Sequence, residues 1–97
     1  MAKGYWVSCY RAITNPDALG EYAKLAGPAI VNGGGTFLAR GGRIAAFEAG
    51  VKERTVVVEF PSFEQALATH DGEAYQAALA KLKGAAERDF RVIEGID

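Results

Sequence analysis

Two arginines and one glutamate stand near the ends of segments that alternate like β-strands. Arg11, Arg40 and Glu59 are each in phase with apolar residues of their own segment, so we expect them on the faces of one sheet. If they converge, two guanidinium groups beside one carboxylate would suit a small carboxylate or enolate ligand, with Glu59 as general base. The alternative is a structural ion pair, or strand ends that emerge into solvent.

His70 is the only histidine and is the second candidate for a catalytic base, because imidazole titrates near neutral pH. Its alternative role is to cap carbonyl groups at the end of a short helix. Cys9 is the only cysteine, so no intramolecular disulfide forms, and no Cys/His spacing predicts structural zinc. We expect Cys9 to be a small buried apolar side chain. We also expect that the protein has no metal site and is located in the reducing cytoplasm.

Aromatic residues form the third candidate group. Tyr10 and Tyr75 are predicted to bind a ligand in an aromatic cavity, with a phenol as proton donor or anchor. Packing in the core or in a dimer interface is the alternative explanation for all members of the group, which are Tyr5, Trp6, Tyr10, Tyr22 and Tyr75.

Length and composition limit the class of protein. The chain has 97 residues, 49% of them apolar and 24% charged, which predicts one globular domain over residues 1–97. The net charge of −1 without a basic cluster argues against nucleic-acid binding. The sequence contains no run of about 18 apolar residues, so no membrane span is predicted. The N-terminus does not resemble a secretory signal.

The strands and helices that must position these residues are predicted from the periodicity of apolar residues and from the positions of glycine, proline and capping residues. Strands are predicted over 4–13, 36–40, 43–49, 54–60 and 89–94, and residues 36–49 form either a hairpin around Gly41-Gly42 or one bent strand. Asn15-Pro16 starts a helix that ends at Gly33. Ser62 with Gln65 starts another, which Asp71-Gly72 interrupts before a last helical segment.

This order predicts an α+β fold, the ferredoxin-like β-α-β-β-α-β plan, with an antiparallel sheet and the helices on one face. The opposite face would carry residues such as Val7, Leu38 and Val57, or their alternates, and either set is too apolar to remain in water. We therefore expect a homodimer in which two sheets meet as a dimeric α/β barrel.

Several ordered sequence blocks also resemble domain-of-unknown-function family 1330. The resemblance covers nearly the whole chain and implies a dimeric α/β barrel of ferredoxin-like subunits, but no reaction. Where the family pattern has a Ser-Pro-Glu-Tyr type of helix start, this chain has Gly72-Glu73-Ala74-Tyr75, so no role of that acid is expected here. The matching blocks are Gly4-Tyr5-Trp6, Gly34-Gly35-x-Phe37-Leu38-x-Arg40-Gly41-Gly42, residues 54–63, and Tyr75-Gln76-Ala77-Ala78-Leu79.

Three functions fit these expectations. The first is an enzyme that uses no metal or organic cofactor and acts on a small acid or carbonyl compound in a pocket between sheet and helices. The second is a non-catalytic dimeric module that binds a small molecule. The third is a structural domain whose pocket is filled by its own side chains, which the lack of a cavity of about 300 Å³ would favour.

Overall fold

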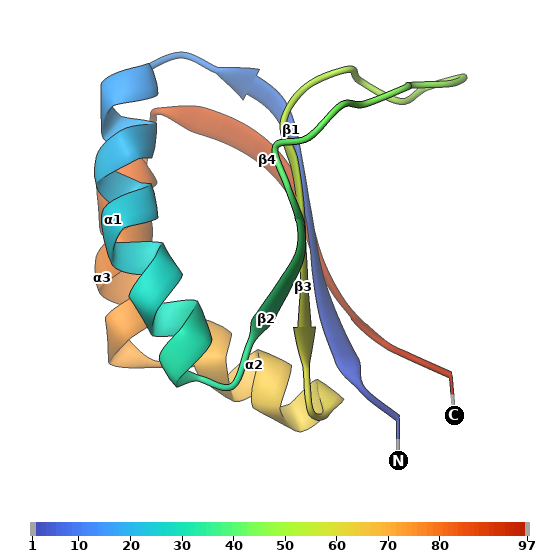
Figure 1. Cartoon of the computed structure of the whole chain (residues 1–97). Coiled ribbons are helices and arrows are strands. Elements are labelled where there is room, and N and C mark those ends of the chain that lie inside the picture. The colour runs from blue at the N-terminus through green and yellow to red at the C-terminus, as the bar shows by residue number, and fades with distance from the viewer. Residues whose placement is uncertain (1, 97) are drawn as a thin grey trace.

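The computed structural model describes residues 2–96, which form a four-stranded sheet and three helices. All strand pairs are antiparallel, in the order β2-β3-β1-β4. The helices cover one face of the sheet and leave the other face open (Figure 1). This arrangement confirms the predicted ferredoxin-like α+β fold. Along the chain the elements are β1 (Gly4–Ile13), α1 (Pro16–Asn32), β2 (Thr36–Arg40), β3 (Thr55–Phe60), α2 (Phe63–Asp71), α3 (Glu73–Leu82) and β4 (Ala86–Glu94).

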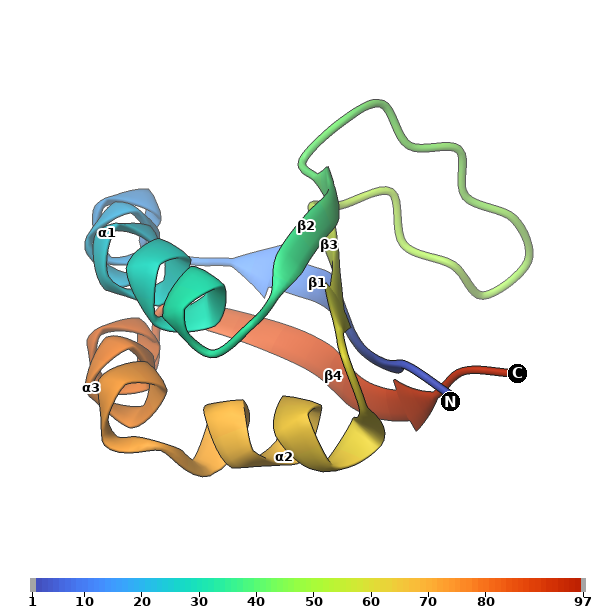
Figure 2. The same cartoon turned by 60° about the horizontal axis from the view of Figure 1, so that its bottom comes forward.

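One predicted strand is wrong, because residues 43–49 lie outside the sheet. β2 ends at Arg40, and a long loop over residues 41–54 leads to β3, so the segment is neither a hairpin strand nor a continuation of β2. The loop projects beyond the sheet on the side away from the helices (Figure 1, Figure 2). Within residues 2–96, the backbone from Gly42 to Ala46 makes no backbone hydrogen bond. This strand-like segment therefore has no neighbouring strand among the described residues.

The last strand is longer than predicted, since it begins at Ala86 and not at residue 89. The extra residues pair with the far end of β1, where Ile13 lies opposite Ala86 and Tyr10 lies opposite Arg88. Pairing with a ten-residue strand thus imposes the strand conformation on a segment without β-branched residues. As a result, Arg88 is a sheet residue.

Side-chain caps fix the starts of two helices. Asn15 Oδ1 accepts a hydrogen bond from Ala18 N, and Ser62 Oγ accepts one from Gln65 N, as predicted. The Gln65 side chain does not return to Ser62 but donates to the Gly33 carbonyl at 2.7 Å, which ties α2 to the end of α1. None of the helices in the described part of the chain is long and apolar enough to cross a bilayer.

Trp6 is at the centre of the core between the sheet and the helices, with only 2% of its surface exposed. Its Nε1 donates a hydrogen bond to the Ala66 carbonyl at 2.9 Å. The rings of Tyr75, Phe60 and Phe90 lie 4.7, 5.0 and 5.3 Å from the Trp6 ring, measured between centroids. These contacts make a rigid aromatic floor beneath the neighbouring cavity.

Candidate functional site

A small cavity lies between α1 and the face of the sheet that the helices cover. It encloses about 50 Å³ and is lined mostly by apolar side chains of α1, β1, β2 and β3. That volume holds a group the size of a carboxylate and is far below the roughly 300 Å³ typical of drug-sized ligands. Any larger ligand must extend through the mouth, where Arg40 is exposed.

Three arginines line this cavity, namely Arg40, Arg54 and Arg88. No Asp, Glu or His is among the lining residues, and within residues 2–96 none of the three guanidinium groups forms an ion pair. Buried or half-buried cations are normally paired, because desolvation disfavours an isolated charge. Three cations around one apolar cavity therefore make it attractive to an anion.

Arg54 contributes a donor that lacks an acceptor. Its Nε is buried and finds no hydrogen-bond partner among the described residues. The guanidinium packs over Gly41, whose φ is 68°, and a Cβ at this glycine would lie 2.7 Å from Arg54 Nη1. Glycine at this position thus allows both the left-handed turn and the close approach of Arg54. A buried N–H without an acceptor is costly, so Arg54 keeps one hydrogen-bond donor unsatisfied.

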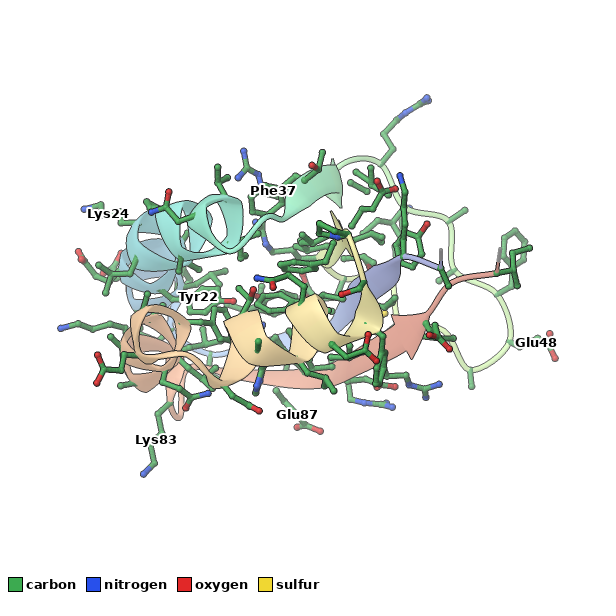
Figure 3. All side chains as sticks on the ribbon, turned by 90° about the horizontal axis from the view of Figure 1, so that it is seen from below. Tyr22, Lys24, Phe37, Glu48, Lys83 and Glu87 are labelled. Atoms are coloured by element: carbon green, nitrogen blue, oxygen red, sulfur yellow. The ribbon has the colours of Figure 1, made fainter. Side chains whose placement is uncertain are left out.

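Arg88 lies in a network of neutral hydroxyl groups. Nη1 donates to Tyr22 Oη and to Ser8 Oγ, and Nη2 donates to Tyr75 Oη, all at 3.3 Å. The two phenol oxygens are 2.7 Å apart, so one phenol donates to the other. Figure 3 shows Tyr22 pointing inward between α1 and α3, whereas Lys24 of the same helix points outward. One phenol O–H of the pair remains available to a further acceptor.

The electrostatics keep this network cationic at all ordinary pH values. Burial raises the pKa of Tyr22 well above its usual range, and the neighbouring Tyr75 raises it further against the opposing effect of Arg88. Tyr22 is therefore a neutral hydrogen-bond donor and not a base. Burial alone would lower the pKa of Arg88, but the oxygens of Tyr22 and Tyr75 outweigh this, and the pKa is raised. The guanidinium consequently stays charged.

The residues singled out in the sequence are divided among three places. Arg40 and Tyr10 line the cavity, and the Arg40 guanidinium lies 4.3 Å from the centre of the Phe37 ring. Tyr75 is fully buried behind the cavity, where it contacts Arg88 and Tyr22 but is not part of the lining. Its phenol oxygen accepts a hydrogen bond from Arg88 Nη2, and its contact with a ligand stays a prediction.

Arg11 and Glu59 do not join Arg40, so the predicted convergence of these three residues is wrong. Both lie on the open face, at opposite ends of the sheet. Glu59 Oε1 accepts a hydrogen bond from Lys3 Nζ at 2.8 Å, and Arg11 Nη2 lies 3.7 Å from Asp89 Oδ2. Arg11 and Glu59 therefore form ion pairs, which was the alternative interpretation of these residues from the sequence.

His70 lies in the last turn of α2, outside the cavity. Its ring packs against the rings of Trp6, Tyr75 and Phe90, with centroid distances of 5.3 to 6.0 Å. Nδ1 is 3.0 Å from Asp71 Oδ1, so His70 does not cap a carbonyl group with this atom. It lines a separate groove of about 640 Å³ together with Lys83 and Arg88.

Sequence reasoning missed Arg54 and Arg88. In both cases the signal was strand phase. Arg54 alternates with Val56, Val58 and Phe60, and Arg88 alternates with Phe90 and Val92, which face the helices. An arginine in phase with core residues at the end of a strand is therefore a candidate for a cavity.

Comparison with known proteins agrees with the fold. The model of a family described as a domain of unknown function, DUF1330, matches residues 3–96. No curated protein sequence matches this chain.

Solved structures give the same picture. A protein of unknown function from Rhodopseudomonas palustris has a TM-score of 0.71 at 19% identity, over 96% of this chain and 80% of that one. A protein from Thermobifida fusca, described as dimeric, ferredoxin-like and of unknown function, has a TM-score of 0.59 at 17% identity, over 98% and 92%. One from Caulobacter crescentus, described as a proposed antibiotic biosynthesis monooxygenase, has a TM-score of 0.58 at 14% identity, over 99% and 91%.

Proposed function

The chain belongs to the DUF1330 family, which is defined without an activity, and we propose from its cavity that it binds a small organic acid. The observation that carries this proposal is the set of Arg40, Arg54 and Arg88 around one apolar cavity, without a carboxylate partner. The carboxylate of the ligand would meet Arg88 and the buried Nε of Arg54, and its carbon atoms would contact the apolar wall of α1.

The small volume of the cavity is the strongest argument for the structural-domain alternative. Its volume of about 50 Å³ is below the roughly 300 Å³ at which a cavity would argue against that alternative. The electrostatics oppose it, because a cavity that serves only packing has no use for three cations and an unpartnered N–H. We therefore favour binding of a ligand whose anionic head is small.

Propionate tests this proposal. We expect a Kd of about 1 mM or lower, and an affinity for neutral propionamide at least about tenfold weaker, since only the carboxylate forms charge-assisted hydrogen bonds. Trp6 is the only tryptophan and lines the cavity, so its fluorescence reports binding directly. Between pH 6 and 9 the affinity should change by less than about twofold, because the arginines stay charged and the pKa of Tyr22 is raised.

Two results would contradict the proposal. Equal affinity for propionate and propionamide would mean that the arginines do not select for charge. No saturable fluorescence change up to about 100 mM propionate, far above the affinity expected of charge-assisted contacts, would mean that the cavity is not a binding site for small acids.

Catalysis is the second candidate function, and the phenol pair on Arg88 favours it. Arg88 donates to the phenol of Tyr22, which is hydrogen-bonded to that of Tyr75, and a substrate oxygen bound by this guanidinium would have negative charge that develops on it stabilised, as in an enolate. The cavity lining contains no carboxylate or imidazole to act as a base. The reactions that fit are therefore those in which the substrate itself supplies the electron pair, such as loss of CO₂ from a β-keto acid.

Acetoacetate separates the enzyme from the binding module. In the enzyme, the C–C bond to the carboxylate breaks, CO₂ leaves, the electron pair moves to the enolate oxygen, and solvent protonates the carbon. We expect an enzyme to accelerate acetone formation, followed by ¹H NMR, at least about tenfold over buffer. Binding of acetoacetate without acceleration would instead support the non-catalytic module.

We also propose that the protein forms a homodimer through the open face of the sheet. Apolar side chains of β1 and β3 occupy the middle of this face. Ion pairs of Lys3 with Glu59 and of Arg11 with Asp89 lie at its two ends, and the pair of Arg91 with Asp89 lies along the edge strand β4. An apolar centre with a charged rim is typical of protein interfaces. The description of the Thermobifida fusca relative as dimeric supports the proposal. The apolar residues of this face are Tyr5, Val7, Cys9, Val57 and Ile93.

A further inference from the structure

The groove beside His70, which we call the edge groove, lies between residues 76–84 and residues 86–90 of the edge strand β4. Its volume of about 640 Å³ is within the range of roughly 300–1,000 Å³ that small-molecule sites occupy. The space exists because α3 packs mainly against α1 and has few contacts with β4. Small side chains keep it open, since Ala80 of α3 and Ala86 of β4 are part of its lining.

Hydrogen bonds fix the two ends of the edge groove. At one end, Gln76 Nε2 donates to the His70 carbonyl at 2.8 Å, which ties α3 to the last turn of α2. At the other end, the turn at Gly84 connects α3 to β4, and the Gly84 carbonyl accepts a hydrogen bond from Thr14 Oγ1 at 3.2 Å. The groove is therefore part of the folded frame and exists before any ligand arrives.

The charged side chains that line the edge groove are cationic, and no carboxylate is among them. Arg88 lines both the cavity and the groove, and within residues 2–96 its guanidinium has hydroxyl partners but no ion pair. Lys83 extends from the rim, whereas Glu87 of β4 points outward and is not part of the lining (Figure 3). Asp71 is exposed and lies against His70 Nδ1. The charge of the groove therefore favours an anion.

The rest of the edge groove is mostly apolar and includes an aromatic ring. The centre of the Phe90 ring lies 4.9 Å from the central carbon of the Arg88 guanidinium and 5.4 Å from the centre of the His70 ring. Leu79 and Leu82 line the side of α3. A flat apolar group packs well against such rings and side chains. A cation and an aromatic ring in one groove thus match an acid that carries a flat apolar body.

We propose that the edge groove is a second binding site, for an organic acid with a flat apolar body, whose carboxylate meets Arg88 and whose body lies between Phe90 and Leu79. The cavity is too small for such a body. The proposal does not rest on the proposed function, because the groove shares only Arg88 and Phe90 with the lining of the cavity.

Titration of the ¹⁵N-labelled protein with phenylacetate, followed by NMR, tests this inference. We expect a Kd of about 1 mM or lower. The amides of Ala80 and Lys83, which line only the groove, should shift more than those of Ala23 and Gly27, which line only the cavity. Neutral phenylacetamide should bind at least about fivefold more weakly, because it forms no charge-assisted hydrogen bond with Arg88.

Two substitutions on α3 form a matched pair. A80F fills the groove with a ring and should weaken phenylacetate binding at least about tenfold. A77F places the same ring at an exposed position outside the groove and should leave the affinity within about twofold of the wild type. Both alanines are exposed, so both variants should keep the fold, which their ¹⁵N spectra check. A80F should also leave propionate binding unchanged, because Ala80 does not line the cavity.

Several outcomes would overturn the inference. These are no saturable shift up to about 20 mM phenylacetate, shifts confined to Ala23 and Gly27, equal affinity of A80F and A77F, or equal affinity for phenylacetate and phenylacetamide. A protein that binds phenylacetate in the groove but binds no propionate would refute the proposed function and support the edge groove as a site. Propionate binding without phenylacetate binding would do the reverse.

Discussion

Replacing Arg88 with methionine is expected to weaken propionate binding about 100-fold while the fold remains as stable as before. The first effect follows from the loss of a charge-assisted contact in a largely desolvated site, which is worth roughly 3 kcal/mol. The second follows from the surroundings of Arg88, which are neutral hydroxyl groups and aromatic rings and not a carboxylate. Removing an unpaired buried charge relieves desolvation.

Weaker propionate binding together with unchanged stability distinguishes a functional residue from a structural one. A structural arginine contributes to stability, so its removal would lower the free energy of unfolding. In R88M the phenols of Tyr22 and Tyr75 still bond to each other, and the methionine side chain fills the space beside Phe90. We expect the free energy of unfolding, measured by urea denaturation, to change by less than about 1 kcal/mol or to rise.

R88K is the matched control for this prediction. Lysine keeps the charge but loses the planar fork that reaches both phenols, so its affinity for propionate should lie between those of the wild type and R88M. If R88M binds propionate like the wild type, the cavity is not the site. If R88M is strongly destabilised, Arg88 is a structural residue and the argument from unpaired charge fails.

The fold could be predicted because its determinants are local. Asn15 and Ser62 mark helix starts that the structure confirms by side-chain caps, and the interruption at Gly72 separates α2 from α3 as expected. Alternation correctly separated the two faces of β1 and β3, and the structure assigns Trp6 and Val58 to the side of the helices and Val7 and Val57 to the open side. Each of these signals acts over a few residues.

The errors arose where structure depends on distant segments. Residues 43–49 are strand-like in sequence, but sequence does not supply a pairing partner, and residues 2–96 offer none. Conversely, residues 86–88 carry no strand signal and become a strand because β1 is long enough to pair with them. The sequence alone could not predict the missing partner of residues 43–49 or the pairing of residues 86–88, since both depend on which segments meet in the fold.

The candidate site shows the same limit. Arg11 and Glu59 share a face, but Glu59 lies opposite Tyr5, six positions from Arg11, a separation of about 20 Å along an extended strand. Phase predicts the face of a side chain and not its position along the sheet. The register of β3 and β4 against β1 was needed to bring Arg54 and Arg88 to one cavity with Arg40.

Substitution of Trp6 with phenylalanine should have the largest effect on stability, and it tests whether the aromatic cluster serves packing or binding. The substitution removes the hydrogen bond from Trp6 Nε1 to the Ala66 carbonyl and leaves a void among the rings of Phe60, Tyr75 and Phe90. The lost hydrogen bond and the lost ring area together should lower the free energy of unfolding by about 2–3 kcal/mol. For a chain of this length, that corresponds to a decrease in Tm of roughly 10 °C or more.

If the cluster is structural, W6F should still bind propionate within about threefold of the wild-type affinity, because the three arginines are unchanged. The measurement then needs calorimetry, since the fluorescent side chain is gone. L25A, at an exposed residue of α1, is the control and should shift the free energy of unfolding by less than about 0.5 kcal/mol. A stable W6F that no longer binds propionate would reverse the assignment, since Trp6 would then be essential for binding and contribute little to folding.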